Sequence, residues 1–518
     1  MDRRRWWALA AVCAATFMLL VDVTIVQVAL PTIQRDFKAS FSDLQWVIDA
    51  YALVLSALIL TSGTLADRFG RKRVFVAGVS VFTVASFLCG VAESSTALIL
   101  SRALQGVGGA AMFATGLALI GQDFQGAERG KAIALWGATV GGAVAAGPLL
   151  GGVITQGISW RWVFFVNVPI GVLTMANAVP RMLNKADPDA KQLDVAGLVT
   201  FSGSLFLLIL ALVRGNDDGW TSAKILALLA GAAALMAAFL LIELHQERPM
   251  FDMSLFRNSA FTGVSLSTFA IGCGMFAAFP YVTLYLQNAL GYSPLAGGLR
   301  MLPATLMAFV VPLLVGRIGD KVPGGLLLSG GLVLSGTGLL LMGGLSPASR
   351  WTALLAGLIL AGIGIGFANP AIGRLALGVV APQRSGMASG ISNTFRVAGL
   401  TTGVAALGAL FQHSLARSLA THIGSVTPNL THQIASEGVR AAGGTGAAPH
   451  DILASYAAGI NEIALIGGLI VLGGAVLGLA FVRAPQPQRA LAAVVLADPA
   501  RQPETQPGGP QPKTEAAR

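Results

Sequence analysis

Apolar runs recur along the chain, and short polar segments rich in Gly, Arg and Lys separate them. A helix of about 20 apolar residues crosses the roughly 30 Å of hydrocarbon in a bilayer. By this length criterion the pattern predicts about 14 transmembrane helices between residues 6 and 482. We therefore expect an all-α polytopic membrane protein.

Composition supports this fold class. Hydrophobic residues make up 54% of the 518 residues and charged residues 11%, whereas a soluble domain carries about 25% charged residues. The net charge of +10 does not indicate nucleic acid binding, because the basic residues lie in short clusters between apolar runs. Cys13, Cys89 and Cys273 all fall inside apolar runs, so we expect no structural disulfide.

The distribution of basic residues predicts the orientation. An even number of helices places both termini on one side, and most of the 34 Lys and Arg residues fall on the side that holds Arg3. Because basic loops stay in the cytoplasm, we expect both termini to be cytoplasmic. We place the protein in the cytoplasmic membrane of a bacterium as a multi-pass protein.

A short pattern occurs twice and suggests two halves. Gly63, Asp67 and Arg68 in "GTLADRFGRK" have a fainter counterpart in "GRIGDKVPGG", which begins at Gly316. We expect an N-terminal six-helix half over 1–180, two inserted transmembrane helices over 181–250 and a C-terminal six-helix half over 251–483. The last half contains a predicted outer loop over 412–454, and 484–518 is predicted to be a disordered cytoplasmic tail. Internal repeats around a central pathway are typical of secondary transporters.

Three charged residues lie inside the predicted spans of the first half: Asp22, Asp49 and Arg102. At 1.5 Å per residue they lie about 12, 8 and 9 Å below the outer surface, in nearly one layer. An intramembrane charge costs about 2.5–3.5 kcal/mol, so each should face the protein interior. One interpretation is a fixed Asp–Arg bridge that orders the bundle. The other is a proton-coupling site, in which Asp22, then Asp49, carries the proton and both compete for Arg102.

The second half differs in charge. Its spans up to residue 411 contain Arg374 and Arg396 but no acidic residue. Phe276, Tyr281 and Tyr285, with Gln105 and Arg396, are candidates for lining a substrate cavity, although aromatic residues at helical spacing also pack in cores. Four histidines between residues 412 and 451 have irregular spacing and no neighbouring cysteine, so we expect no metal site.

Five motifs carry a family resemblance. "GTLADRFGRKR" (Gly63–Arg73), "SRALQGVGGA" (Ser101–Ala110) and "GPLLGG" (Gly147–Gly152) resemble signatures of the major facilitator superfamily. "LVDVTIVQVALP" and "WRWVFFVNVPIG" are similar to its fourteen-span drug–proton antiporter branch. The chain departs from the fifth-helix pattern at Ala143, where the family usually has glycine.

The resemblance implies roles for two of these motifs. It implies a conformational latch in which Asp67 docks on the N-terminus of a helix in the other half, with the latch formed by Gly63, Asp67, Arg68, Gly70 and Arg71. It implies an antiporter motif at Gly147, Pro148, Gly151 and Gly152. Members of this family that handle dications often carry further carboxylates in the spans of the second half, so the lack of acidic residues in its spans up to residue 411 argues against substrates that must be dications.

We therefore expect a proton-driven antiporter that exports lipophilic drugs, antibiotics or toxic metabolites by alternating access. A dedicated exporter of one endogenous metabolite or lipid-like compound, or a symporter of the same fold, is the alternative. We expect no enzymatic activity and no cofactor besides the proton gradient, since no Walker motif or Ser–His pairing is found at membrane depth. The expected partners are a small lipophilic substrate, protons and the lipid bilayer, without nucleic acid, and we expect a functional monomer.

Overall fold

The computed structural model describes residues 3–39, 41–184, 194–245, 253–318, 322–378, 380, 385–423, 428–441 and 448–482. Met1–Val482 forms one compact unit. The described residues are helical without any strand, which confirms the predicted fold class. The predicted tail over 484–518, Asp320 and Lys321 lie outside these residues.

Among the described residues, 13 helices are long and apolar enough to cross a membrane. A further long helix, α5 (Gly126–Gly157), packs between α1 and α12 and brings the arrangement to the predicted fourteen. Helices are favoured here because hydrocarbon offers no hydrogen-bond partners, so the backbone N–H and C=O groups of a spanning segment must bond to one another.

The first predicted half contains seven helical segments. They are α1 (Arg3–Phe37), α2 (Phe41–Phe69), α3 (Arg71–Gly90), α4 (Ser95–Asp123), α5, α6 (Trp162–Phe165) and α7 (Asn167–Arg181). The inserted pair is α8 (Val195–Asp218) and α9 (Ala223–His245).

The second half begins with one long span that changes its winding. The span consists of α10 (Ser259–Ile271), α11 (Ala277–Leu284) and the π-helical segments η2 (Gly272–Phe276) and η3 (Tyr285–Ala289). The remaining long helices are α12 (Pro294–Ile318), α13 (Gly324–Leu341), α14 (Leu355–Gly378), α15 (Ser385–Ile423) and α18 (Pro449–Phe481). The short segments are η1 (Met253–Arg257), η4 (Trp351–Leu354), α16 (Pro428–Glu437) and η6 (Gly438–Ala441).

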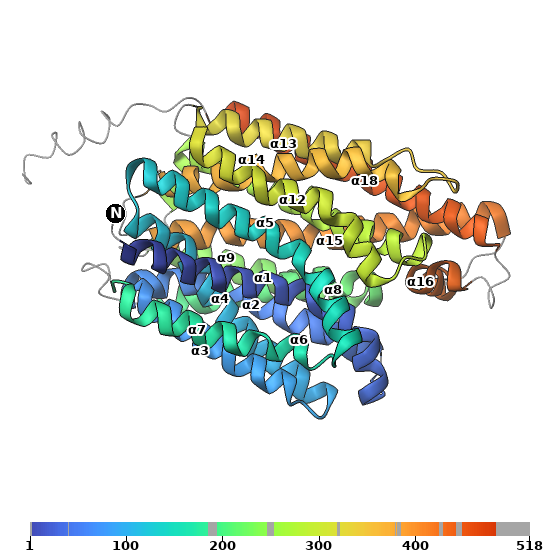
Figure 1. Ribbon diagram of the computed structural model, residues 1–518, viewed down its shortest axis with the longest axis horizontal. Helices are drawn as coiled ribbons and strands as arrows, with labels where there is room; N and C mark the ends of the chain where they lie inside the picture. The colour runs from blue at the N-terminus through green and yellow to red at the C-terminus, as the bar shows by residue number, and fades with distance from the viewer. Residues whose placement is uncertain are drawn as a thin grey trace, which may run out of the picture. The chain divides into compact units, whose positions relative to one another are not determined.

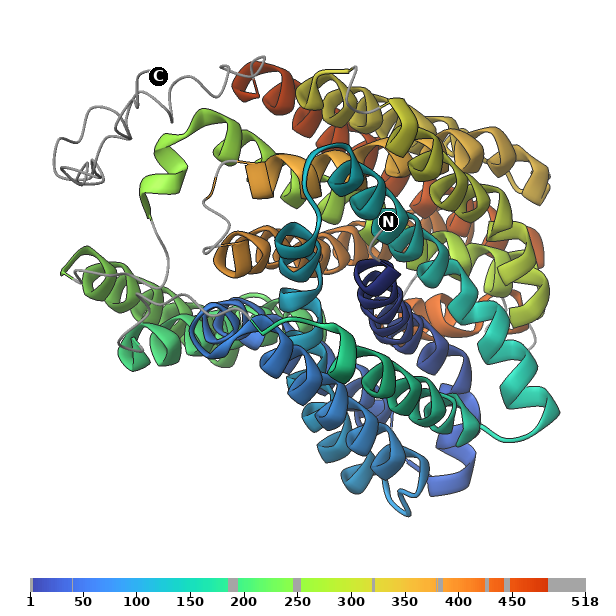
Figure 2. The same ribbon diagram turned by 60° about the vertical axis from the view of Figure 1, so that its left-hand side comes forward.

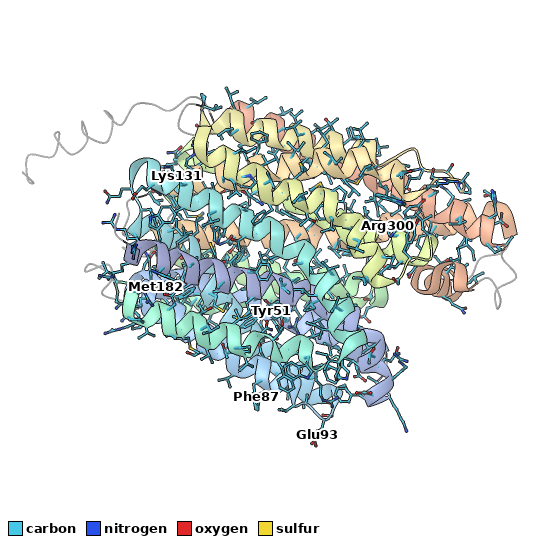
Figure 3. The ribbon with its side chains drawn as sticks, in the orientation of Figure 1. Tyr51, Phe87, Glu93, Lys131, Met182 and Arg300 are labelled. Carbon is cyan, nitrogen blue, oxygen red and sulfur yellow. The ribbon has the colours of Figure 1, made fainter. Side chains whose placement is uncertain are left out.

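The long helices run side by side along the horizontal direction of Figure 1. We call the end at which α1 begins the proximal end and the end that carries α16 the distal end. Lys131 and Met182 lie at the proximal end, Arg300 lies toward the distal end, and Tyr51 lies between them (Figure 3).

The two halves meet along five helix pairs: α2–α15, α4–α15, α5–α12, α5–α14 and, less extensively, α4–α14. The inserted helix α8 contacts both α2 and α15, and the α8–α9 pair stands at one side of the bundle in Figure 2. Phe201 of α8, Leu60 of α2 and Ile391 of α15 belong to one buried apolar cluster. Thr61 of α2 also shares a hydrogen bond with Ser202 of α8, with 2.9 Å between the hydroxyl oxygens. The inserted pair therefore covers the seam between the halves on this side.

The repeat seen in the sequence reappears as two equivalent packing contacts. A Cβ added at Gly63 of α2 would lie 2.6 Å from the carbonyl oxygen of Gly386, in the first turn of α15. A Cβ added at Gly316 of α12 would lie 2.8 Å from Cβ of Ala134, in the first turns of α5. Each glycine thus lets one helix approach the start of a helix in the opposite half, at the proximal end of the bundle.

The predicted loop over 412–454 is wrong in its described part. Helix α15 continues to Ile423, α16 and η6 follow, and α18 already begins at Pro449. Leu415 and Leu419 lie four residues apart on α15 and are buried together with Ile434 of α16 and Ile452 of α18. This apolar stripe stabilises helix despite the polar composition of the segment.

Candidate functional site

Asp22 lies in the middle of α1 and has no exposed surface. Its Oδ1 accepts hydrogen bonds from Nε2 of Gln105 at 2.9 Å and from Nδ2 of Asn167 at 3.0 Å. Its Oδ2 forms an ion pair with Nη1 of Arg102. Helices α1, α4 and α7 therefore supply a buried carboxylate and three groups that satisfy its charge.

Arg102 is positioned by partners on two helices besides α1. Its Nε donates to the carbonyl oxygen of Val47 at 3.0 Å, and its Nη1 donates to Oε1 of Gln105 at 2.7 Å. The guanidinium carbon lies 4.2 Å from the ring centroid of Tyr51, which adds a cation–π contact. A Cβ at Gly106 would lie 2.7 Å from the Tyr51 carbonyl oxygen, so this glycine lets α4 approach α2 closely enough for these contacts.

Ser86 of α3 completes the cluster. Its hydroxyl accepts a hydrogen bond from Nε2 of Gln105 at 2.8 Å and donates to the carbonyl oxygen of Phe82. We call Asp22, Tyr51, Ser86, Arg102, Gln105 and Asn167 the Asp22 network.

Asp49 is the second acid of the predicted proton-coupling site. It is half-buried on α2, and it is not among the partners of Arg102 in the described part of the chain. The ion pair that the structure shows for Arg102 is the one with Asp22. Which acid carries a proton stays a prediction.

Sequence reasoning missed Ser86 and Asn167. Asn167 occupies the middle of "WVFFVNVPIG", where a polar amide is costly unless it finds a partner. This signal was available, but the partner of Asn167 comes from α1, 145 residues away.

The residues of the predicted latch meet the other half at the proximal end. Asp67 of α2 accepts hydrogen bonds from the backbone N–H groups of Gly386 at 3.1 Å and Met387 at 2.8 Å, in the first turn of α15. These groups lack intrahelical partners, and the helix dipole favours a carboxylate there. Arg71 of α3 forms an ion pair with Asp67 at 2.9 Å.

The remaining latch residues lie close by. The φ angle of Gly70 is +96°, which favours glycine and lets the chain turn from α2 into α3. The guanidinium of Arg68 lies 5.3 Å from the ring centroid of Phe69.

The predicted antiporter motif lies where α5 packs between the two halves. A Cβ at Gly147 would lie 1.7 Å from Oγ1 of Thr24, two residues after Asp22 on α1. Gly151 also approaches α1, whereas Gly152 approaches Leu295 of α12. Pro148 is in α5, and its side chain lies outside the described set.

Ala143 is fully buried. Close packing against α12 at this level comes from the neighbouring Gly141, where a Cβ would lie 2.7 Å from the Ala308 carbonyl oxygen.

The five candidates for lining a substrate cavity lie at different places in the structure. Gln105 belongs to the Asp22 network. Tyr285 is 1% exposed in the core of the second half, and Phe276 packs against that core. Tyr281 is half-buried and donates to the Val404 carbonyl oxygen at 2.7 Å. Arg396 is buried on α15 and donates to Oδ1 of Asn369 on α14 at 2.9 Å.

Comparison with known proteins places this geometry in a family. A sequence model described as Major Facilitator Superfamily matches residues 12–404. The chain is 35% identical over 435 residues to "Multidrug resistance protein Stp" of Mycobacterium tuberculosis, covering 83% of this chain and 80% of that protein. It is 34% identical over 426 residues to "Puromycin resistance protein pur8" of Streptomyces alboniger, covering 81% and 84%.

A solved structure gives the same fold. The human organic anion transporter MFSD10 (TETRAN) superimposes with a TM-score of 0.61 at 13% identity, over 92% of this chain and 99% of that one. At this identity the similarity concerns the fold alone. The family match and the multidrug and antibiotic resistance relatives are consistent with the fourteen-helix bundle and with the contacts of its motif residues. The chain therefore belongs to the major facilitator superfamily and is a multi-pass membrane protein.

Proposed function

We propose that the protein exports lipophilic drugs, antibiotics or toxic metabolites from a bacterial cytoplasm in exchange for protons. The observation that carries the proposal is Asp22, a fully buried carboxylate in the apolar bundle whose charge one cation satisfies. Relatives named for multidrug and puromycin resistance support the substrate class. We place the proximal end in the cytoplasm because basic residues gather there, as the positive-inside rule requires.

Protonation of Asp22 has a direct structural consequence. A neutral carboxyl group no longer compensates Arg102, whose remaining partners are the Val47 carbonyl, Gln105 and the Tyr51 ring. Because Thr24 of α1 packs on Gly147 of α5, a shift of α1 reaches α5 two residues from Asp22. Helix α5 also contacts α12 and α14 of the other half. Protonation of Asp22 can thereby affect the interface along which the two halves move during alternating access.

The proposed cycle starts from a state closed at the proximal end. Asp67 holds α2 on the first turn of α15, and Asn393 of α15 donates to the Phe113 carbonyl of α4 at 3.4 Å. Opening toward the cytoplasm requires these contacts to break, and closing restores them. This is the latch function we propose for the motif.

The proton gradient is a sufficient energy source. One charge moving through about 150 mV releases about 3.5 kcal/mol. A tenfold concentration gradient costs about 1.4 kcal/mol, so one proton sustains roughly a few-hundred-fold gradient of a neutral substrate. We propose that no further cofactor is needed and that one chain suffices.

The test compares proton-driven export with exchange in the absence of a gradient. In everted vesicles, Asp22→Asn should abolish proton-driven transport of puromycin and ethidium, yet keep equilibrium exchange of the same compounds. Asp36→Asn, which removes an acid on the same helix at the distal end, is the matched control and should transport as wild type. Proton-driven transport that persists in Asp22→Asn contradicts the proposal. Loss of both activities identifies a fixed structural bridge instead.

The alternative is a dedicated exporter of one metabolite, or a symporter. A growth-inhibition panel in a pump-deficient host separates one-compound from multi-compound export. In the same vesicles, substrate movement in the direction of proton flow would show symport.

A further inference from the structure

Arg396 is a buried cation in the second half that forms no ion pair with any described residue. The residue lies on α15 and is 8% exposed. Its Nη1 donates to Oδ1 of Asn369, and its Nε is buried without a hydrogen-bond partner among the described residues. None of the ion pairs between described residues includes Arg396.

Asn369 adds a second unused donor at the same place. Its Oδ1 accepts from Arg396, whereas its Nδ2 is buried without an acceptor among the described residues. Two neighbouring helices therefore each carry a buried N–H donor that has no acceptor among the described residues, and a hydrogen bond joins the two side chains. Burying an unpaired charge or donor costs free energy that a bound anion would recover.

The first half contains the opposite arrangement. Arg102 is also buried, but its charge is matched by Asp22. Among the described residues, the Arg102–Asp22 pair has no net charge, whereas the Arg396–Asn369 pair carries one positive charge.

Arg396 also lies at the boundary between the halves. Three residues earlier on α15, Asn393 donates to the Phe113 carbonyl of α4, and the next residue, Val397, packs against the apolar cluster of the first half. Pro370, adjacent to Asn369, contacts Gly137 of α5. A substrate that passes between the halves therefore comes within reach of these donors.

The backbone around Arg396 is unusually close to a π-helical segment. A Cβ at Gly272 of η2 would lie 2.6 Å from the Arg396 carbonyl oxygen. Such segments inside α-helices occur frequently at functional sites. Here the segment fixes α15 against the long span at the level of Arg396.

From these contacts we propose that Arg396 and Asn369 bind a carboxylate of the transported compound. A guanidinium presents parallel donors that match a carboxylate, and the Asn369 amide supplies one more. The inference rests on the proposed export function and adds to its substrates lipophilic compounds that carry one anionic group.

Three probes with the same ring and different charge test this site: 1-naphthoate, 1-naphthamide and 1-naphthylmethylammonium. Binding to the full-length protein in nanodiscs is measured by calorimetry. Wild type should bind 1-naphthoate at least tenfold more tightly than either other probe. Arg396→Gln should weaken 1-naphthoate binding at least tenfold and change 1-naphthamide binding less than twofold. Arg396→Lys, which keeps the charge but loses the planar fork, should be intermediate.

The matched control is Arg300→Gln. Arg300 lies on α12 of the same half and stacks on Tyr292, 3.5 Å from the ring centroid. Its replacement should leave the preference for 1-naphthoate unchanged. Equal binding of the three probes by wild type, absence of 1-naphthoate binding, or a preference retained in Arg396→Gln would overturn the proposal.

A second measurement separates binding from a structural role. Without a probe, the Tm of Arg396→Gln should equal or exceed that of wild type, because the variant removes an uncompensated buried charge. A drop of several degrees would identify Arg396 as a structural residue and overturn the proposal. Failure of the export function is seen separately, as puromycin transport that does not depend on Asp22.

Discussion

Asp22 of α1 and Arg102 of α4 form an ion pair in the interior of the bundle, and neither side chain is more than 1% exposed. The pair does not stand alone, because Gln105 contacts both members and Asn167 contacts the acid. Breaking a buried pair by removing one partner leaves an uncompensated charge. Changes to the neighbouring amides are therefore milder and more informative.

Asn167→Ala removes one hydrogen bond to the Asp22 carboxylate. A hydrogen bond to a charged group contributes about 1.5–3 kcal/mol, so we expect proton-driven export to fall about tenfold or more. Efflux rates in everted vesicles at matched protein levels measure the change. Asn177→Ala is the control on the same helix, since Asn177 donates to the Trp7 carbonyl, outside the Asp22 network. Equal rates in both variants would contradict a role for Asn167.

Asp67→Asn weakens the latch on α15. The variant loses the ion pair with Arg71 and the charge that two backbone N–H groups donate to. We expect the closed proximal state to lose at least about 1.5 kcal/mol, which is more than a tenfold shift in population. The distance between spin labels at positions 73 and 326 is measured by double electron–electron resonance. In Asp67→Asn the distance distribution should contain a longer component than in the same labelled protein without this substitution.

The latch prediction has its own control. Asp218→Asn removes an acid that pairs with Lys224 at 2.7 Å, at the start of the α8–α9 connection. It should leave the distance distribution unchanged. An unchanged distribution in Asp67→Asn as well would show that the contact does not hold the proximal end closed.

Gly147→Ala tests the contact between α1 and α5. The added methyl group would lie 1.7 Å from Oγ1 of Thr24, so the helices must separate. Overpacking costs about 1–3 kcal/mol, and we expect a lower Tm together with loss of export. Adding Thr24→Ala to this variant should partly restore both Tm and export, because it removes Oγ1, the atom nearest to the added methyl group.

Gly330→Ala and Gly473→Ala are matched controls for this variant. Each glycine lies in a helix, and an added Cβ would have no neighbour within 4 Å. Both variants should keep wild-type export and an equal or higher Tm, since alanine favours helix. If Gly147→Ala also kept wild-type export and Tm, close packing of α1 on α5 at Gly147 would not be required.

Asp36 provides a pH-dependent contact outside the membrane spans. Hydrogen bonds from Trp160 (2.7 Å) and then Arg161 (3.2 Å) hold the pKa of this carboxyl below its usual value. A lowered folded-state pKa stabilises the protein above the unfolded pKa, about 4, and this stabilisation is lost as the pH falls through the folded value. The Tm difference between wild type and Asp36→Asn should therefore favour wild type at pH 6 and shrink below about pH 4. A difference that does not change with pH would show that the carboxylate charge is not involved.

Local sequence determined the helices and the class of protein. Runs of apolar residues of spanning length form helices because hydrocarbon offers no other hydrogen-bond partner to the backbone. The same reasoning failed at 412–454, where polar composition concealed the four-residue spacing of Leu415 and Leu419. Spacing, rather than composition, decides whether a segment has an apolar face to bury.

Sequence also placed Asp22, Asp49 and Arg102 at one depth, because depth follows from counting residues along a helix. Which acid pairs with Arg102 depends on the rotation of each helix and on its neighbours. Those are set by contacts between distant segments, such as Gly106 on Tyr51 and Gly147 on Thr24. Asn167 joins Asp22 across 145 residues, and Arg396 meets Asn369. Only the tertiary structure decides these partnerships, because a side chain's partner depends on which helices pack together and how closely.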